Sequence, residues 1–266
     1  MLGRTFIGVC LKRFSRRLAS AQMSSASSYE KSLPPILLIF SHMSLLVLIR
    51  HGQSQWNLEN RFTGWTDVPL SARGEADSGK TGKVLLERGF RFDCAFTSRL
   101  LRASDTLRII LKILGQENIP TETDSALNER HYGDLQGLNK AETAEKYGQE
   151  QTLLWRRDYF VRPPNGESIE DCGHRVTPYF KYGILPRVYE GKNVIVTASG
   201  NSMRPMVKFL ENLSPEKAAV LELGLCIPYV YEFKGEKMVR KEVIDVPGVL
   251  TLGASQTKKE IKEGKV

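Results

Sequence analysis

A short apolar run, residues 45–49, ends abruptly at Arg50, His51 and Gly52. A run of this length bounded by a glycine predicts a buried strand, and ligands of α/β proteins usually bind at the carboxyl ends of such strands. Arg50 offers a planar set of donors for phosphate or carboxylate, and His51 can act as a nucleophile, an acid or a base near neutral pH. Gly52 would let a ligand approach the backbone closely. An Arg-His pair by itself is more often structural, so its meaning depends on the rest of the chain.

Two further apolar runs, residues 94–97 and 193–198, predict two more buried strands, and helical patterns separate the three. This alternation predicts an α/β fold, a three-layer sandwich with a mostly parallel central sheet. Two late strands, 227–233 and 238–244, are expected to form a hairpin, and residues 121–133 are expected to be irregular. Helices are predicted at 71–87, 99–114, 140–147, 149–157, 167–188 with a break near Pro178, 202–213 and 215–223.

The two ends of the chain differ in composition from its body. Residues 1–43 hold six Lys or Arg and one acidic side chain, with a serine-rich stretch, which is typical of an organellar transit peptide. An unprocessed extension, or a true start at Met43, fits the same residues. We predict a leader at 1–43, a catalytic domain at 44–246 and a mobile tail at 247–266. The protein is then cytoplasmic or, if the leader is a transit peptide, mitochondrial.

The charge of +8 is concentrated in the leader, so the body is only mildly basic. This balance favours a local pocket for a small anion over a nucleic-acid surface. The four cysteines lie far apart, without metal-ligand or disulfide spacing, and are expected to be reduced thiols in an intracellular protein. The apolar stretch 36–49 is interrupted by Ser41 and His42, so no membrane span is expected.

Several motifs occur in order along the body. They are LIRHGQSQWN, RFTGWTDVPLS, TSRLLRA, LNERHYGDLQGLNK, WRRDY and SGNSMRP. Together they resemble the cofactor-dependent phosphoglycerate mutases of the histidine phosphatase superfamily, over about residues 45–245. The resemblance implies a glycolytic isomerase that interconverts 3-phosphoglycerate and 2-phosphoglycerate, with 2,3-bisphosphoglycerate as primer and no metal. Its partners would be small phosphoglycerates rather than nucleic acid or membrane.

The resemblance also implies roles for single residues. His51 would become a phosphohistidine, Glu129 would be the general acid/base, and Arg50 and Arg102 would neutralise the transferred phosphoryl group. Further cations would hold the remaining anionic groups of the ligand, namely Arg130, Lys140, Arg156 and Arg157. Neutral donors would come from Asn57, Thr63, Gly64, Tyr132, Gly200 and Asn201. Without the resemblance, we would interpret Glu129, Lys140 and the adjacent pair Arg156 and Arg157 as solvated surface charges.

One departure concerns the chemistry directly. Ser199 stands where the family has a second histidine, which stabilises the transferring phosphoryl group, and a serine hydroxyl cannot carry positive charge. Leu101 replaces a common lysine, and the short turn at 163–167 favours a monomer or small homo-oligomer. Three hypotheses remain: a mutase, slow because of Ser199; a catalytically impaired binding or regulatory homologue; and a phosphatase of the same fold.

Overall fold

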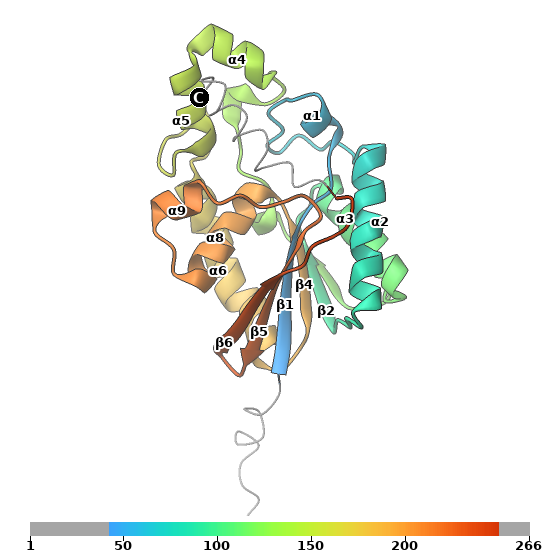
Figure 1. Cartoon of the computed structure of the whole chain (residues 1–266). Helices are drawn as coiled ribbons and strands as arrows, with labels where there is room; N and C mark the ends of the chain where they lie inside the picture. The colour runs from blue at the N-terminus through green and yellow to red at the C-terminus, as the bar shows by residue number, and fades with distance from the viewer. Residues whose placement is uncertain (1–42, 250–266) are drawn as a thin grey trace, which may run out of the picture. The chain divides into compact units, whose positions relative to one another are not determined.

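A computed structural model of the chain describes residues 43–249. Within them lies one six-stranded sheet in the order β3-β2-β4-β1-β5-β6 (Figure 1). The strands are β1 (Met43–Arg50), β2 (Cys94–Thr97), β3 (Thr121–Thr123), β4 (Val194–Ala198), β5 (Pro228–Lys234) and β6 (Lys237–Val243). Strands β1 to β4 run parallel, whereas β5 and β6 form an antiparallel hairpin beside β1. The predicted α/β sandwich with a mostly parallel central sheet is confirmed.

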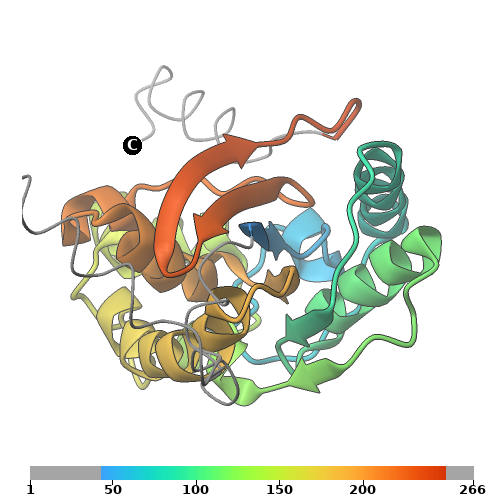
Figure 2. The ribbon, with the colours of Figure 1, turned by 90° about the horizontal axis from the view of Figure 1, so that it is seen from below.

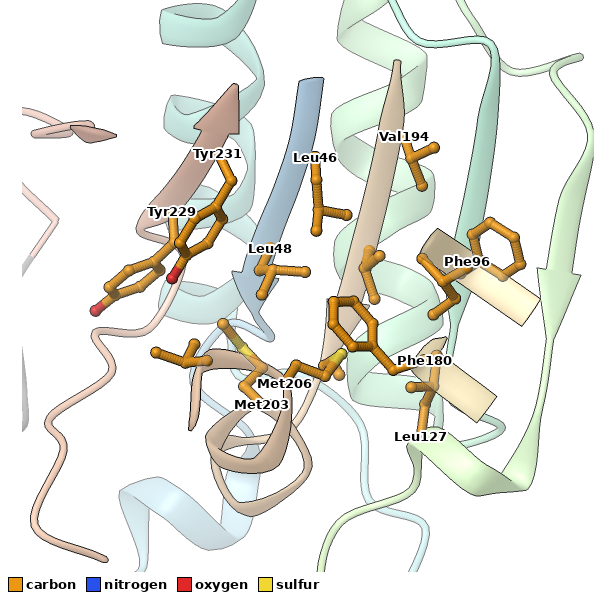
Figure 3. Close-up of a cluster of buried hydrophobic side chains, with 14 of the residues drawn as sticks. Leu46, Leu48, Phe96, Leu127, Phe180, Val194, Met203, Met206, Tyr229 and Tyr231 are labelled. Carbon is orange, nitrogen blue, oxygen red and sulfur yellow. The ribbon is translucent and has the colours of Figure 1, made fainter. Parts of the chain in front are cut away.

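The side chains of β1 alternate between two apolar layers, because successive residues of a strand point to opposite faces. Leu46 and Leu48 belong to one buried cluster, and Figure 3 shows them with Met203 and Met206 of α8 (Gly200–Glu211). The same cluster includes residues of α6 (Ile169–Tyr179). Val47 and Ile49 belong to a second cluster, with residues of α2 (Ala72–Glu87) and α3 (Leu101–Leu114). Helices therefore cover both faces of the sheet, as the view along the strands shows (Figure 2). Burial on both faces explains why β1 and β4 are continuous apolar runs.

The helices lie close to their predicted positions. They are α1 (Gln55–Leu58), α2 (Ala72–Glu87), α3 (Leu101–Leu114), α4 (Lys140–Tyr147), α5 (Gln149–Arg157), α6 (Ile169–Tyr179), α7 (Leu185–Tyr189), α8 (Gly200–Glu211) and α9 (Pro215–Ala219). The predicted break near Pro178 is confirmed as a π-helical segment, Phe180–Ile184, between α6 and α7. Proline removes a backbone donor from the helix, so the winding changes close to it.

Three local predictions were wrong. Residues 121–123 are not irregular but form the edge strand β3, which pairs with β2 and whose three residues are all exposed. An exposed strand of three residues carries no apolar pattern. The helix α8 begins at Gly200 rather than at residue 202, and α9 ends at Ala219 rather than at residue 223. In addition, the single turn α1, capped by Ser54, was not predicted.

The described residues include the whole predicted catalytic domain, 44–246, but little of the predicted leader and tail. Residues 1–42 of the predicted leader and 250–266 of the predicted tail lie outside the described residues. Met43 is the first residue of β1, and Val249 is buried against the core. No helix in the described range is long and apolar enough to cross a membrane. Cys94, Cys172 and Cys226 are free thiols.

Candidate active site

A polar cavity of about 320 Å³ lies at the carboxyl ends of β1 and β4. Helices α1, α4 and α5 lie beyond this end of the sheet (Figure 1). Most of the predicted site residues line it: Arg50, His51, Asn57, Thr63, Gly64, Arg102, Glu129, Tyr132, Lys140, Arg156, Arg157, Gly200 and Asn201. Residues that are far apart in sequence thus share one cavity. In total, seven Lys or Arg side chains and two carboxylates line it, so it suits a ligand with several negative charges.

His51 follows directly on β1 and is almost completely buried. Its backbone N–H donates to the carbonyl of Ala198, 3.0 Å away, which ties the end of β1 to the end of β4. Its ring Nδ1 lies 2.7 Å from the carbonyl oxygen of Gly52. Because a carbonyl only accepts, Nδ1 carries the proton and Nε2 keeps its lone pair.

Burial lowers the pKa of His51 well below its ordinary value, and the positive charges of Arg102 and Arg50 lower it further. The imidazole is therefore neutral at pH 7. A neutral imidazole with a lone pair on Nε2 is the form that can attack phosphorus.

Arg102, in the first turn of α3, is buried and points its guanidinium at the loop after α1. Its Nη2 donates to the carbonyl of Gly64 at 2.8 Å, and its Nη1 donates to the carbonyl of Thr66 at 3.1 Å. Arg50 donates through Nη1 to the carbonyl of Leu223 at 2.9 Å, while its Nε is buried without a partner among the described residues. Two fixed guanidinium groups thus supply positive charge that acts on His51.

Glu129 is held in place by backbone groups from two segments. Its Oε1 accepts from the N–H of Arg130 at 2.7 Å and from the N–H of Asn201, in the first turn of α8, at 3.2 Å. Its carbonyl oxygen accepts from Arg175 at 2.8 Å and from the indole of Trp65. Anchoring one carboxylate oxygen leaves the other able to exchange a proton with a ligand in the cavity.

Lys140, the first residue of α4, lines the cavity with its ammonium 5.8 Å from the ring centre of Phe62. Burial lowers its pKa to about 7, and the nearby charges of Arg156, Arg50 and Arg157 act in the same direction. Arg157, at the end of α5, lies 3.5 Å from the carboxylate of Glu222. The outer part of the cavity is therefore a cluster of cations with few compensating acids.

Two predicted site residues do not line the cavity. Arg130 is buried behind the wall: its guanidinium donates to the carbonyls of Trp155 and Arg156 and lies over the ring of Tyr132. It fixes α5 to the loop of Glu129. Ser199 is fully buried, and its Oγ has no hydrogen-bond partner among the described residues.

Gly52 has a different role from the predicted one. A Cβ built on Gly52 would lie 2.6 Å from the carbonyl oxygen of Gly74, in the first turn of α2. The missing side chain therefore lets α2 pack against the loop after β1, and Gly52 does not line the cavity. The local sequence around His51 could not distinguish the close approach of a ligand from the close approach of a helix.

Some residues that line the cavity were missed by the sequence analysis, among them Arg61, Arg204 and Glu222. Arg204 follows Asn201 by three positions in a helix, so the two lie on one face. This spacing could have identified Arg204 as a site residue, because Asn201 was already predicted to be one. Arg61 carried no signal, because it lies in a loop, and Glu222 lies after the end of α9, in a segment that was predicted to be helical.

Comparison with known proteins agrees with this geometry. The model of the histidine phosphatase superfamily (branch 1) matches residues 46–245. The chain belongs to the histidine phosphatase superfamily. It is 51% identical over 194 residues to a protein of Gloeobacter violaceus named 2,3-bisphosphoglycerate-dependent phosphoglycerate mutase 2, covering 73% of this chain and 88% of the relative. It is 49% identical over 198 residues to the 2,3-bisphosphoglycerate-dependent phosphoglycerate mutase of Afipia carboxidovorans, covering 74% and 96%.

Several solved structures have the same fold as this chain. YhfR of Bacillus stearothermophilus aligns with a TM-score of 0.65 at 25% identity, over 78% of this chain and 98% of that one. A mycobacterial glucosyl-3-phosphoglycerate phosphatase aligns with a TM-score of 0.61 at 25% identity, over 77% and 98%. The predicted resemblance to the superfamily and to its cofactor-dependent mutases is confirmed.

Proposed function

We propose that this protein is a 2,3-bisphosphoglycerate-dependent phosphoglycerate mutase that acts through a phosphohistidine at His51. The observation that carries the proposal is a neutral imidazole with a free Nε2, in a cavity that also holds Arg50, Arg102 and Glu129. The names of relatives about half identical in sequence support the same substrate class.

The proposed reaction has two half-reactions. Nε2 of His51 attacks the phosphorus of one phosphate of 2,3-bisphosphoglycerate, the bond from that phosphorus to the glycerate oxygen breaks, and Glu129 donates a proton to the leaving oxygen, which gives a phosphohistidine and a monophosphoglycerate. In the reverse half-reaction the free hydroxyl of 3-phosphoglycerate attacks the phosphohistidine, Glu129 accepts its proton, and 2,3-bisphosphoglycerate forms. Transfer of the 3-phosphate of this bisphosphoglycerate to His51 then releases 2-phosphoglycerate. Arg50 and Arg102 stabilise the charge on the transferred group.

The donor set fits 2,3-bisphosphoglycerate, which carries two phosphates and a carboxylate. Beyond the pair beside His51, the cavity offers Lys140, Arg156 and Arg157 for the groups that are not transferred. Among residues 43–249 no group of His, Cys, Asp or Glu side chains could hold a metal ion. We assign the electrostatic work to the cationic side chains that line the cavity. The proposed partners are small phosphoglycerates, and the proposed state is a monomer or small homo-oligomer.

A coupled assay with enolase tests the proposal. We expect 2-phosphoglycerate to form from 3-phosphoglycerate, and the rate to rise when 2,3-bisphosphoglycerate is added. No turnover above background, with or without the primer, would refute it.

One observation favours a second candidate, a catalytically impaired binding or regulatory homologue. Ser199 follows β4 at the position that neighbours His51, because Arg50 and Ala198 are paired in register. Its hydroxyl is buried and makes no hydrogen bond to a described residue. Ser199 does not line the cavity, so its hydroxyl does not replace the charged donor that the family's second histidine would provide.

The third candidate is a phosphatase in which water takes the phosphoryl group from His51. The structural neighbour named as a phosphatase shares the fold at 25% identity. Measuring phosphate release and isomerisation from the same mixture separates the two activities. Phosphate release that outpaces isomerisation would favour the phosphatase.

Ligand affinity should depend on pH through Lys140. Because its pKa is lowered to about 7, the ammonium is charged and attracts an anion below this pH and loses its charge above it. We expect the affinity of the wild type for 3-phosphoglycerate, divided by that of Lys140→Met, to fall about tenfold from about pH 6 to about pH 8. The ratio cancels the ligand's own titration. A ratio that stays constant in calorimetric titrations would contradict the prediction.

A further inference from the structure

Arg204 is a buried cation of the cavity with no assigned role. It lies in the second turn of α8, lines the cavity and is only 6% exposed. Burying a guanidinium costs free energy unless its donors are satisfied. The hydrogen-bond partners of Arg204 therefore indicate its role.

Arg204 fixes the side chain of Asn201. Its Nη1 donates to Oδ1 of Asn201 at 2.9 Å, and its Nη2 donates to the carbonyl of Leu221 at 3.0 Å. Because the amide oxygen of Asn201 faces Arg204, the amide nitrogen faces the hydroxyl of Tyr132, 3.2 Å away. Arg204 thus determines which end of this amide donates on the Tyr132 side.

Two guanidinium groups flank the backbone of Gly200. A Cβ built on Gly200 would lie 3.3 Å from Nε of Arg50 and 3.5 Å from Nη1 of Arg204. The Nε atoms of both arginines are buried and have no hydrogen-bond partner among the described residues. Buried donors of like charge without partners are what an anionic ligand would satisfy.

Arg204 and Arg50 lie at the same part of the cavity wall, on the two sides of Gly200. Burial lowers the pKa of Arg204 to about 10, and the charges of Arg157 and Arg50 act in the same direction. In the proposed function the phosphate beside His51 is held by Arg50 and Arg102, which leaves Arg204 for another anionic group of the ligand. In 3-phosphoglycerate that group is the carboxylate.

We propose that Arg204 is a positioning residue for the substrate carboxylate: it orients the Asn201 amide and adds a fixed positive charge beside Gly200. This inference rests on the proposed function, since it takes the ligand to be a phosphoglycerate.

Two ligands that differ only in the carboxylate test it. Glycerol 3-phosphate has the phosphate of 3-phosphoglycerate but an alcohol in place of the carboxylate. In calorimetric titrations of the full chain, we expect Arg204→Met to weaken 3-phosphoglycerate binding about 30-fold and glycerol 3-phosphate binding less than threefold. An equal loss for both ligands, or no loss, would overturn the inference.

Matched variants separate positioning from general effects. Lys208→Met removes a cation from the same helix outside this cavity and should change neither affinity. In the pair Arg204→Met and Asn201→Ala, the double variant should lose less than the product of the single losses, because one side chain acts through the other. If the double variant loses the full product of the two single losses of affinity, Arg204 does not act through Asn201, and that part of the inference is overturned.

A conservative variant keeps the test usable if Arg204→Met does not fold. Lys keeps the charge in Arg204→Lys but cannot donate to both Asn201 and Leu221 in the arginine's geometry. We expect a loss of 3-phosphoglycerate affinity of about fivefold, and unchanged affinity would overturn the inference. If the wild type binds neither ligand, the proposed function fails instead.

Discussion

Replacing His51 with alanine is expected to abolish phosphoryl transfer. In the wild type, incubation with 2,3-bisphosphoglycerate should give an acid-labile phosphoryl adduct that intact mass spectrometry detects. His51→Ala removes the attacking Nε2, so the adduct should be absent and mutase turnover should fall by at least about 10⁴-fold.

The control is a histidine outside the cavity. His174 is exposed on α6, so His174→Ala should retain both adduct and turnover. An adduct that persists in His51→Ala would place the phosphoryl group on another residue and contradict the proposed mechanism. An adduct without turnover in the wild type would favour the impaired homologue, because the first half-reaction would have survived.

Replacing Ser199 with histidine is expected to raise the mutase rate at least tenfold. The position follows Ala198, which pairs with Arg50, so an imidazole there would lie beside His51 and could donate to the transferring phosphoryl group. Loss of one such donor commonly costs about 10²–10³ in rate, and restoring it should recover part of that factor. The coupled enolase assay measures the change.

Ser199→Ala is the matched control for that gain. The serine hydroxyl has no hydrogen-bond partner among the described residues, so its removal should leave the rate unchanged. Since histidine is larger and the position is fully buried, thermal unfolding should show whether the variant folds. An unchanged or lower rate in a folded Ser199→His would show that the serine is not the defect.

The positions of the buried strands and of the long helices followed from the sequence. β1 and β4 are continuous apolar runs because both of their faces are covered, and α2 and α3 repeat at the helical period. The edge strand β3 could not be found in this way, because its three residues are all exposed. An apolar pattern in a sequence results from burial, so an exposed strand or helix does not show one.

Single site residues followed from the sequence less completely. Arg130 carries the right charge for a ligand contact, yet its guanidinium is used by the carbonyls of Trp155 and Arg156. Arg204 was not among the predicted site residues, yet it lines the cavity. Whether a cation faces a ligand or a carbonyl depends on which backbone groups end nearby, and spacing along the chain does not contain that information.

The sequence by itself determined the alternation of strands and helices, the place of His51 at the end of a buried strand, and the family. Only the tertiary structure decided which cations surround the cavity, that Gly52 serves the packing of α2, and that the Ser199 hydroxyl is buried without a partner. The reason is physical. Hydrophobic periodicity and motif spacing are local properties, whereas Glu129 and Asn201, 72 positions apart, meet only when the sheet brings its strand ends together.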